Sequence, residues 1–302
     1  LVTGIVITAI GLALLPVGIK YASGGAAAFQ MNAPEWGDFS RWGLALVVIF
    51  VALGFKFFTR GTMSSAAILI GLIAGYVVGY LTGAVNFGGV AKAAWFAVPQ
   101  PFKYGIEFSA FAIIGMCLMS LVSAIETVGD ISGIAKGGAN REATDKELSG
   151  GTYADGFGSF IAGLFGGLPN TSFSQNVGLI SMTGVMSRSV VTLGALFLVA
   201  CGLIPKVGAV VAAMPISVLG GGVIMMFGMV VSAGINMLSG VNWNRRNMII
   251  LAMSLSVGLG IQAVPKSMQH LPDSFEMLMV SGLLPAAAIS VILNLLIPKD
   301  ID

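Results

Sequence analysis

Long runs of apolar residues, separated by short polar connections, dominate the chain. A membrane-spanning helix needs about 20 predominantly apolar residues, and ten runs approach that length. They cover residues 1–19, 42–58, 63–85, 108–134, 149–168, 170–187, 189–204, 207–238, 246–264 and 277–297. These runs are apolar on all sides, whereas the strands of a membrane β-barrel alternate polar and apolar positions. The pattern therefore predicts an all-α polytopic membrane protein with about ten transmembrane helices.

One long run contains its own helix-breaking signals. Residues 207–238 include Pro215 and the glycines 220–222. Proline inside a helix removes a backbone hydrogen bond and clashes with the preceding turn. We therefore expect this run to be broken near its start.

Composition narrows the function classes further. The chain of 302 residues is 56% hydrophobic and 9% charged, whereas a soluble domain carries roughly 25% charged residues. This excludes a soluble enzyme, and a net charge of +2 offers no basic footprint for nucleic acid. Cys117 and Cys201 lie in apolar runs without the spacing of a disulfide framework or a metal site, so we expect no metal or cofactor. His270, the single histidine, falls in an expected outer loop without a nucleophile beside it, so a membrane enzyme is disfavoured.

The basic residues predict the orientation in the membrane. If the spans alternate, nine Lys and Arg fall on one side (56, 60, 136, 141, 146, 188, 245, 246 and 299) and six on the other (20, 41, 92, 103, 206 and 266). Cytoplasmic loops carry the excess of positive charge. We therefore expect a multi-pass protein of the plasma (inner) membrane with a cytoplasmic C-terminus, and interpret Arg245 and Arg246 as a topology anchor.

Glycines recur on helix faces in two places. Gly71, Gly75, Gly79 and Gly83 form a ladder of four-residue spacing, which lets another backbone approach closely. We expect tight packing within one protomer, with a sliding surface or a dimer contact as the alternative. A loose similarity between residues 1–19 and 222–238 is weak evidence for an internal repeat, a common feature of transporters.

Three acidic residues lie inside expected spans, where ionisable groups are costly and usually functional. Glu126 and Asp155 fall about 7 Å and 6 Å to the cytoplasmic side of their span midpoints, at 1.5 Å per helical residue. They therefore lie at one level of an antiparallel helix pair, and Asp130 lies one turn from Glu126 on the same face. Burial and mutual repulsion disfavour full ionisation, which suits proton uptake and release. The alternatives are a helix-end acid for Asp130 and a structural hydrogen bond for Asp155.

The stretch after Pro169 has the features of a broken span. The residue before a proline disfavours helical backbone, and Asn, Thr and Ser at 170–172 disfavour an immediate restart. About 12 residues, 175–186, then precede Arg188. As a helix they cover about 18 Å, which is too short for a bilayer core of about 30 Å.

We therefore expect extended backbone over residues 170–174, followed by a half-helix that begins near the membrane midplane. Free N–H groups and the N-terminus of such a half-helix can bind a ligand. Gln175 lies at this junction, and its amide offers both a donor and an acceptor to the edge of a heterocycle. The alternative is a helix cap in a tight external turn.

These features coincide with three ordered motifs. They read Glu126-Thr127-Val128-Gly129-Asp130, Ala154-Asp155-Gly156 and Gln175-Asn176-Val177-Gly178-Leu179-Ile180-Ser181-Met182-Thr183-Gly184. On these motifs the chain resembles the nucleobase–ascorbate transporter (nucleobase:cation symporter) family, specifically its bacterial xanthine/uric acid permease branch. The resemblance extends over essentially the whole chain.

The resemblance implies a fold of fourteen helices in two inverted seven-helix repeats. On that map the chain begins inside a larger membrane protein and holds helices 5–14, with one broken span. Residues 1–85 would form gate helices of the first repeat, 108–204 the core that binds substrate, and 207–297 gate helices of the second repeat. A homodimer through the gate helices and an elevator-like movement of core against gate would follow, with the glycine ladder as a plausible sliding surface.

The resemblance also implies roles for single residues. Glu126 and Gln175 would hydrogen-bond a purine from two sides, and Phe173 and Ser174 would offer backbone and packing at its edge. Asn176 would shape selectivity, while Asp130 and Asp155 would support the site and proton coupling. Gln175 favours an oxidised purine, because relatives that take uracil tend to carry glutamate at that position.

We therefore expect a proton-coupled symporter of xanthine or uric acid that needs no cofactor besides the coupling ion. A uracil-type permease is one alternative. An anion transporter of the same fold would need a positively charged side chain at the half-helix, and the sequence has none between Gln175 and Ser187. A non-transporting membrane fragment or scaffold lacking the first four helices is the alternative from a different class.

Overall fold

The computed structural model describes residues 1–34, 36–173, 176, 180 and 185–298, and these ranges contain helices, turns and irregular segments but no strand. Their helices are α1 (Val2–Ala22), α2 (Ala26–Gln30), α3 (Phe39–Phe58), α4 (Thr62–Ser65), α5 (Ala67–Leu81), α6 (Gly88–Lys92), α7 (Ala110–Ala139), α8 (Asp145–Leu164), α10 (Arg188–Gly202), α11 (Pro205–Ala212), α12 (Ile216–Ser239), α13 (Arg245–Ala263), the 3-10 helix η1 (Pro265–Met268), α14 (Asp273–Val280) and α15 (Leu283–Leu296). The prediction of an all-helical protein is confirmed for these ranges.

Five of the described helices are long and apolar enough to cross a membrane, namely α1, α3, α7, α12 and α13. Helices α10 and α11 together form a sixth candidate span, bent by 87° at the residues that join them. Pro205 begins α11 and explains the bend, because its ring cannot continue the hydrogen-bond ladder of the preceding helix. The structure is thus that of a multi-pass membrane protein, with fewer full-length spans among the described residues than the ten predicted.

Differences from the predicted spans lie at helix breakers. The break expected in residues 207–238 is confirmed, because α11 ends at Ala212 and α12 begins at Ile216, just after Pro215. The glycines 220–222 nevertheless lie within α12. A single span over 277–297 is wrong, because Gly282, at φ +71°, separates α14 from α15.

The described chain divides into two compact units. The first unit comprises Leu1–Leu14, Gln100–Gly184 and Gly228–Asp302, and the second comprises Leu15–Pro99 and Val185–Phe227. Helices α1 and α12 contribute residues to both units. All three acidic residues predicted to carry chemistry belong to the first unit.

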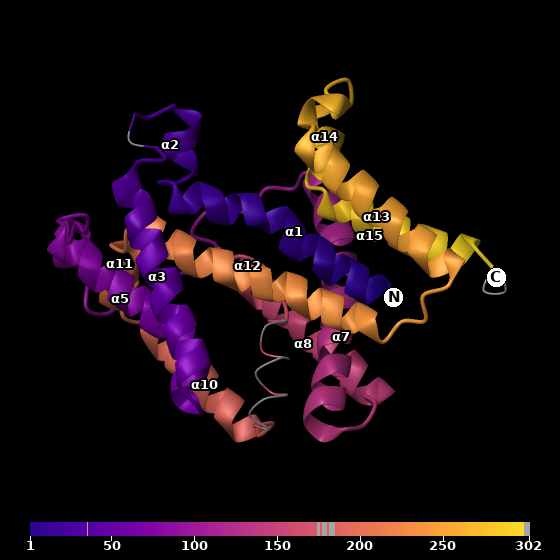
Figure 1. The fold of residues 1–302 in the computed structure, drawn as a ribbon, viewed down its shortest axis with the longest axis horizontal. Coiled ribbons are helices and arrows are strands. Elements are labelled where there is room, and N and C mark those ends of the chain that lie inside the picture. The colour runs from indigo at the N-terminus through magenta and orange to yellow at the C-terminus, as the bar shows by residue number, and fades with distance from the viewer. Residues whose placement is uncertain (35, 174–175, 177–179, 181–184, 299–302) are drawn as a thin grey trace. The chain divides into compact units, whose positions relative to one another are not determined.

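Close helix packing builds the first unit. Val6 of α1, Val122 of α7 and Leu284 of α15 form one buried cluster, which joins these three helices. Helices α13 and α15 lie side by side (Figure 1). A Cβ at Gly258 would lie 2.5 Å from the carbonyl oxygen of Gly282, so only glycine permits this approach.

The glycine ladder lies in the second unit, where α5 packs against α3 (Figure 1). Gly71, Gly75 and Gly79 are buried in α5. A Cβ at Gly71 would lie 2.7 Å from the carbonyl oxygen of Val48, so packing within the chain is confirmed for this glycine. Gly83 does not belong to the packed stripe, because α5 ends at Leu81 and Gly83 takes a positive φ of +74°. The predicted span of residues 63–85 is also divided at its start, where Ala66 separates α4 from α5.

Candidate functional site

Helices α7 and α8 form the hairpin that carries Glu126, Asp130 and Asp155. Helix α7 ends at Ala139, and its C-cap residue Asn140 takes left-handed backbone, a common helix-terminating conformation. Thr144 begins α8 with a capping box, in which its side chain accepts from the Glu147 N–H and the Glu147 carboxylate accepts from the Thr144 N–H. The turn therefore fixes where the second helix begins relative to the first.

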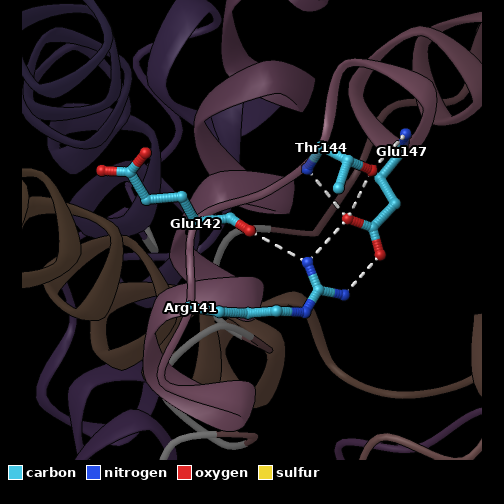
Figure 2. Close-up of polar contacts among 4 residues, drawn as sticks. All are labelled: Arg141, Glu142, Thr144 and Glu147. Carbon is cyan, nitrogen blue, oxygen red and sulfur yellow. Dashed lines mark hydrogen bonds and ion pairs between the residues drawn. The ribbon is translucent and has the colours of Figure 1, made fainter.

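An ion pair reinforces this turn. Arg141 donates two hydrogen bonds to the Glu147 carboxylate, at 2.8 and 2.6 Å, and one to the Glu142 carbonyl at 2.9 Å (Figure 2). The guanidinium of Arg141, followed by the Thr144 N–H and hydroxyl, holds the pKa of the Glu147 carboxyl well below its usual range. The hydrogen bonds and negative charge of Glu147 in turn raise the pKa of Arg141.

We expect the contribution of Glu147 to stability to depend on pH. A carboxyl whose pKa is lowered by folding stabilises the fold above its ordinary pKa of 4.5 and loses this effect as the pH falls further. The Glu147→Gln variant should therefore melt below the wild type at neutral pH, and the difference should shrink below pH 4.5. Thermal unfolding in detergent across this range measures the effect, and added salt should reduce it. A difference in melting temperature that depends on neither pH nor salt would contradict the prediction.

The chain that leaves α8 returns along the helix pair without helical structure. Helix α8 ends at Leu164, and residues 167–173 form neither helix nor strand. The Ser159 hydroxyl accepts from the Asn170 N–H at 3.1 Å and lies 3.1 Å from the Asn170 carbonyl oxygen. The Ser123 hydroxyl of α7 donates to the Thr171 hydroxyl at 3.0 Å. The interruption predicted over residues 170–174 is thus confirmed for its described part, residues 170–173, and side-chain contacts with α7 and α8 hold it in place.

Glu126 and Asp155 line one cavity of about 550 Å³ in the first unit. Its wall also includes Ser123, Asn170 and Thr171, so acceptors and hydroxyl or amide donors face the same space. The Thr171 hydroxyl lies 3.5 Å from a carboxylate oxygen of Glu126, at the outer limit of hydrogen bonding. Small-molecule sites have this size and this combination of an apolar wall with few polar groups. We call this space the acid cavity.

Asp155 is held from two sides. The hydroxyl of Thr127, on α7, donates to one carboxylate oxygen of Asp155 at 2.5 Å. The side-chain amide of Asn170 lies 3.5 Å from the other oxygen. Thr127 is only 2% exposed, so this is a shielded contact between α7 and α8. Because Thr127 directly follows Glu126, Glu126 and Asp155 lie at about the same level of the α7–α8 pair, on the cavity that both line.

Asp130 occupies a different environment from the other two acids. It is 1% exposed and is not among the residues that line the acid cavity. The hydroxyl of Ser172 donates to one of its carboxylate oxygens at 2.5 Å. The non-helical stretch thus contacts two acids of α7 through neighbouring hydroxyls, Glu126 through Thr171 and Asp130 through Ser172.

The remaining predicted site residues follow in the chain. Phe173 is half-exposed, and its carbonyl accepts from the N–H of Asn176 at 2.9 Å. Asn176 is exposed and helical. Ser174 and Gln175 lie outside the described residues, as does most of the expected half-helix.

Sequence reasoning missed the residues that hold the acids. Ser123 and Thr127 were not assigned to the site, nor were the hydroxyls of Thr171 and Ser172. One signal was available, because Ser123 and Thr127 are four residues apart and share a helix face beside Glu126. Their partners could not be found in this way, because Thr171 and Ser172 reach α7 only through an irregular chain path.

The site has the chemistry of recognition by hydrogen bonding. Within the described ranges, no three His, Cys, Asp or Glu side chains are grouped so that they could hold a metal ion. Carboxylates, hydroxyls and an amide on a largely apolar wall can instead pair with the polar edges of a flat molecule.

The chain as a whole is similar in sequence to known proteins. Residues 1–267 match the family described as "Permease family" (Xan_ur_permease). The chain is 36% identical over 296 residues to the xanthine permease of Bacillus subtilis, covering 97% of this chain and 66% of that protein. It is 37% identical over 299 residues to the nucleobase transporter PlUacP of Paenibacillus larvae, covering 98% and 67%. It is 36% identical over 297 residues to the uric acid transporter UacT of Escherichia coli, covering 97% and 60%.

The matched relatives are longer than this chain. The first two curated relatives are covered over 65% and 66% of their length, so the chain spans about two thirds of them.

Proposed function

Because this chain belongs to the Permease family, within the nucleobase–ascorbate transporters that its three motifs resemble, we propose that it serves secondary active transport of an oxidised purine, xanthine or uric acid. The relatives are named permeases and transporters rather than enzymes. Their names include xanthine permease and uric acid transporter, which supports a purine over uracil as substrate. The match confirms the family predicted from the motifs.

One observation carries the proposal, namely that Glu126 and Asp155 face one cavity beside the irregular stretch at 170–172. An oxidised purine presents N–H donors and carbonyl acceptors in one plane. Carboxylates accept from the N–H groups, and the hydroxyls of Ser123 and Thr171 can donate to carbonyl oxygens. Non-helical backbone at membrane depth occurs where it is buried in protein or lines a cavity, which agrees with this position.

Site roles within this proposal follow the family resemblance. Glu126 and Gln175 hold the purine from two sides, Phe173 and Ser174 pack at its edge, and Asn176 shapes selectivity. Asp155 and Asp130 support the site and take part in proton coupling. The contact of Ser172 with the buried Asp130 supports a link between that acid and the stretch leading to the half-helix.

The finer architecture is also part of the proposal. We infer helices 5–14 of a 7+7 inverted-repeat fold, with gate helices in residues 1–85 and 207–297 and core helices in 108–204. The protein resides in the plasma membrane with its C-terminus in the cytoplasm. It forms a homodimer through gate helices within the lipid bilayer, needs no cofactor besides H+ as coupling ion, and binds no nucleic acid. The positive charge of the loops supports the orientation.

Uptake of radiolabelled xanthine by cells expressing the complete gene product tests the proposed function. We expect saturable uptake of xanthine. Unlabelled uric acid should inhibit it strongly and uracil only weakly, and a protonophore should abolish it. Uptake that survives the protonophore but requires sodium would overturn proton coupling alone. No uptake of either purine above empty-vector cells would overturn the function.

Thr127 provides a test of how Asp155 is positioned. Thr127→Val keeps the shape of the side chain but removes the hydroxyl that donates to Asp155 at 2.5 Å. A hydrogen bond to a charged group contributes about 1.5–3 kcal/mol, so Vmax/KM for xanthine should fall about 10-fold or more. Thr127→Ser restores the hydroxyl and should recover most of this loss. Equal activity of the Val and Ser variants, at equal amounts in the membrane, would show that the contact does not matter for transport.

A further inference from the structure

A second cavity lies at the end of α8, in the same unit as the acid cavity. It measures about 310 Å³ and is lined by residues 102–106, before α7, and by the last turns of α8. The acid cavity takes its part of α8 from residues 152–159. None of the predicted site residues lines this second space, which we call the outer cavity because α8 ends there on the side expected to face outward.

The backbone holds the wall of the outer cavity in a defined position. The N–H of Phe102 donates to the carbonyl of Leu164 at 2.8 Å, which ties the loop to the end of α8. A turn follows, in which the N–H of Gly105 donates to the carbonyl of Phe102 at 2.9 Å. The ring of Tyr104 lies against Gly166, where a Cβ would come within 2.5 Å of a ring carbon. Gly166 thus leaves room for the tyrosine ring.

The lining of the outer cavity combines aromatic faces with one positive charge. Phe102, Tyr104 and Phe160 contribute rings, and Lys103 is the one charged side chain among the described lining residues. The ammonium of Lys103 lies 5.9 Å from the centre of the Tyr104 ring, so the cation and this aromatic face occupy the same region. Rings beside an ammonium group suit a flat aromatic anion, which stacks on the ring and pairs with the charge.

Ser159 lines both cavities, so they adjoin at this residue. Asp155 lies four residues earlier in α8, which is about 6 Å along the helix axis. The Ser159 hydroxyl is bonded to Asn170, which approaches Asp155. Asp155 therefore lies within about one helical turn of the edge of the outer cavity at Ser159.

We propose that the outer cavity is a first docking site for the anionic form of the substrate, a planar purine anion such as urate, held by Lys103 and stacked on Tyr104. This inference rests on the proposed function and orientation. The charges at the two sites differ in sign, since Lys103 attracts an anion whereas Glu126 and Asp155 repel it unless a proton accompanies the substrate. The outer cavity thus raises the local concentration of the anion beside the acid cavity, and binding at the acids follows when a proton accompanies the substrate.

Transport kinetics of the complete gene product test this docking site, with urate as the anionic purine and hypoxanthine as an uncharged one at neutral pH. At low salt, Lys103→Gln should raise the KM or the inhibition constant for urate by about fivefold and leave Vmax unchanged. A change of about fivefold is the upper end of what an exposed ion pair contributes. The values for hypoxanthine should stay constant, and added salt should remove the difference. Lys103→Arg should have the wild-type values, and Tyr104→Leu should weaken the binding of both purines.

Lys266→Gln is the matched control, because it removes a charge from the same expected side of the membrane without touching this cavity. Equilibrium binding of labelled urate to the purified protein gives a readout that does not depend on transport. Unchanged urate KM and urate affinity in Lys103→Gln, or an equal shift for urate and hypoxanthine, would overturn the docking site while leaving the proposed function intact. Wild-type protein that neither transports nor binds xanthine or urate would overturn both.

Discussion

Purine uptake is expected to be lost in Glu126→Gln, with the amount of protein in the membrane unchanged. The amide keeps the size of the side chain, but it loses the negative charge, one of its two acceptor oxygens and the capacity to exchange a proton. The loss of one hydrogen bond from a purine to a charged acceptor, at about 1.5–3 kcal/mol, alone corresponds to about 10-fold or more, and the loss of proton exchange adds to it. Initial rates of labelled xanthine uptake measure it.

A second glutamate provides the control for this variant. Glu107 is exposed, precedes α7 and does not line the acid cavity, so Glu107→Gln should transport at the wild-type rate. Wild-type uptake in Glu126→Gln would remove Glu126 from the site. A loss of membrane-inserted protein in that variant would show instead that Glu126 stabilises the helix hairpin.

Of the substitutions considered, Arg246→Ala should cause the largest loss of free energy of unfolding. Arg246 is only 6% exposed at the start of α13, and its guanidinium binds the end of α15. It donates to the carbonyls of Ile297 and Asn294 at 2.9 and 2.6 Å and to the side-chain oxygens of Asn247 and Asn294 at 3.1 Å. These carbonyls have no partner within α15, because a helix leaves its last carbonyls unsatisfied. Losing the guanidinium should cost about 3 kcal/mol of folding free energy.

The neighbouring arginine separates this effect from a general loss of positive charge. Arg245 is exposed, so Arg245→Ala should alter the melting temperature in detergent much less than Arg246→Ala. Arg246→Lys should not restore stability, because a single ammonium cannot reproduce the fork that reaches four acceptors. Equal melting temperatures for the two alanine variants would refute the role of Arg246 as the cap of α15.

The hydrophobic pattern alone predicts some helix boundaries correctly and misses others. The run predicted at residues 246–264 corresponds to α13, Arg245–Ala263, because Asn244 supplies an N-cap immediately before the apolar stretch. Residues 277–297 contain an apolar run of similar quality, yet Gly282 divides it. The turn there depends on a close approach between Gly282 and α13, a contact that no local pattern reports.

Arg246 and the glycine ladder make the same point about side chains. As a pair, Arg245 and Arg246 have the pattern of a topology anchor, but only the tertiary structure distinguishes the buried arginine from the exposed one. Gly71 and Gly83 belong to one ladder of four-residue spacing, but of these two only Gly71 contacts another helix, because α5 has ended before Gly83.

The order of residues by itself determined the helical membrane class, the family and the level at which Glu126 and Asp155 meet. These properties follow from run length, motif spacing and helical rise, which are local or nearly so. Only the tertiary structure decided which hydroxyls hold the acids, that Asp130 is buried apart from the acid cavity, and that Ser159 lines two cavities. The physical reason is that an irregular segment such as residues 167–173 has no repeating geometry, so its partners are selected by packing against distant helices.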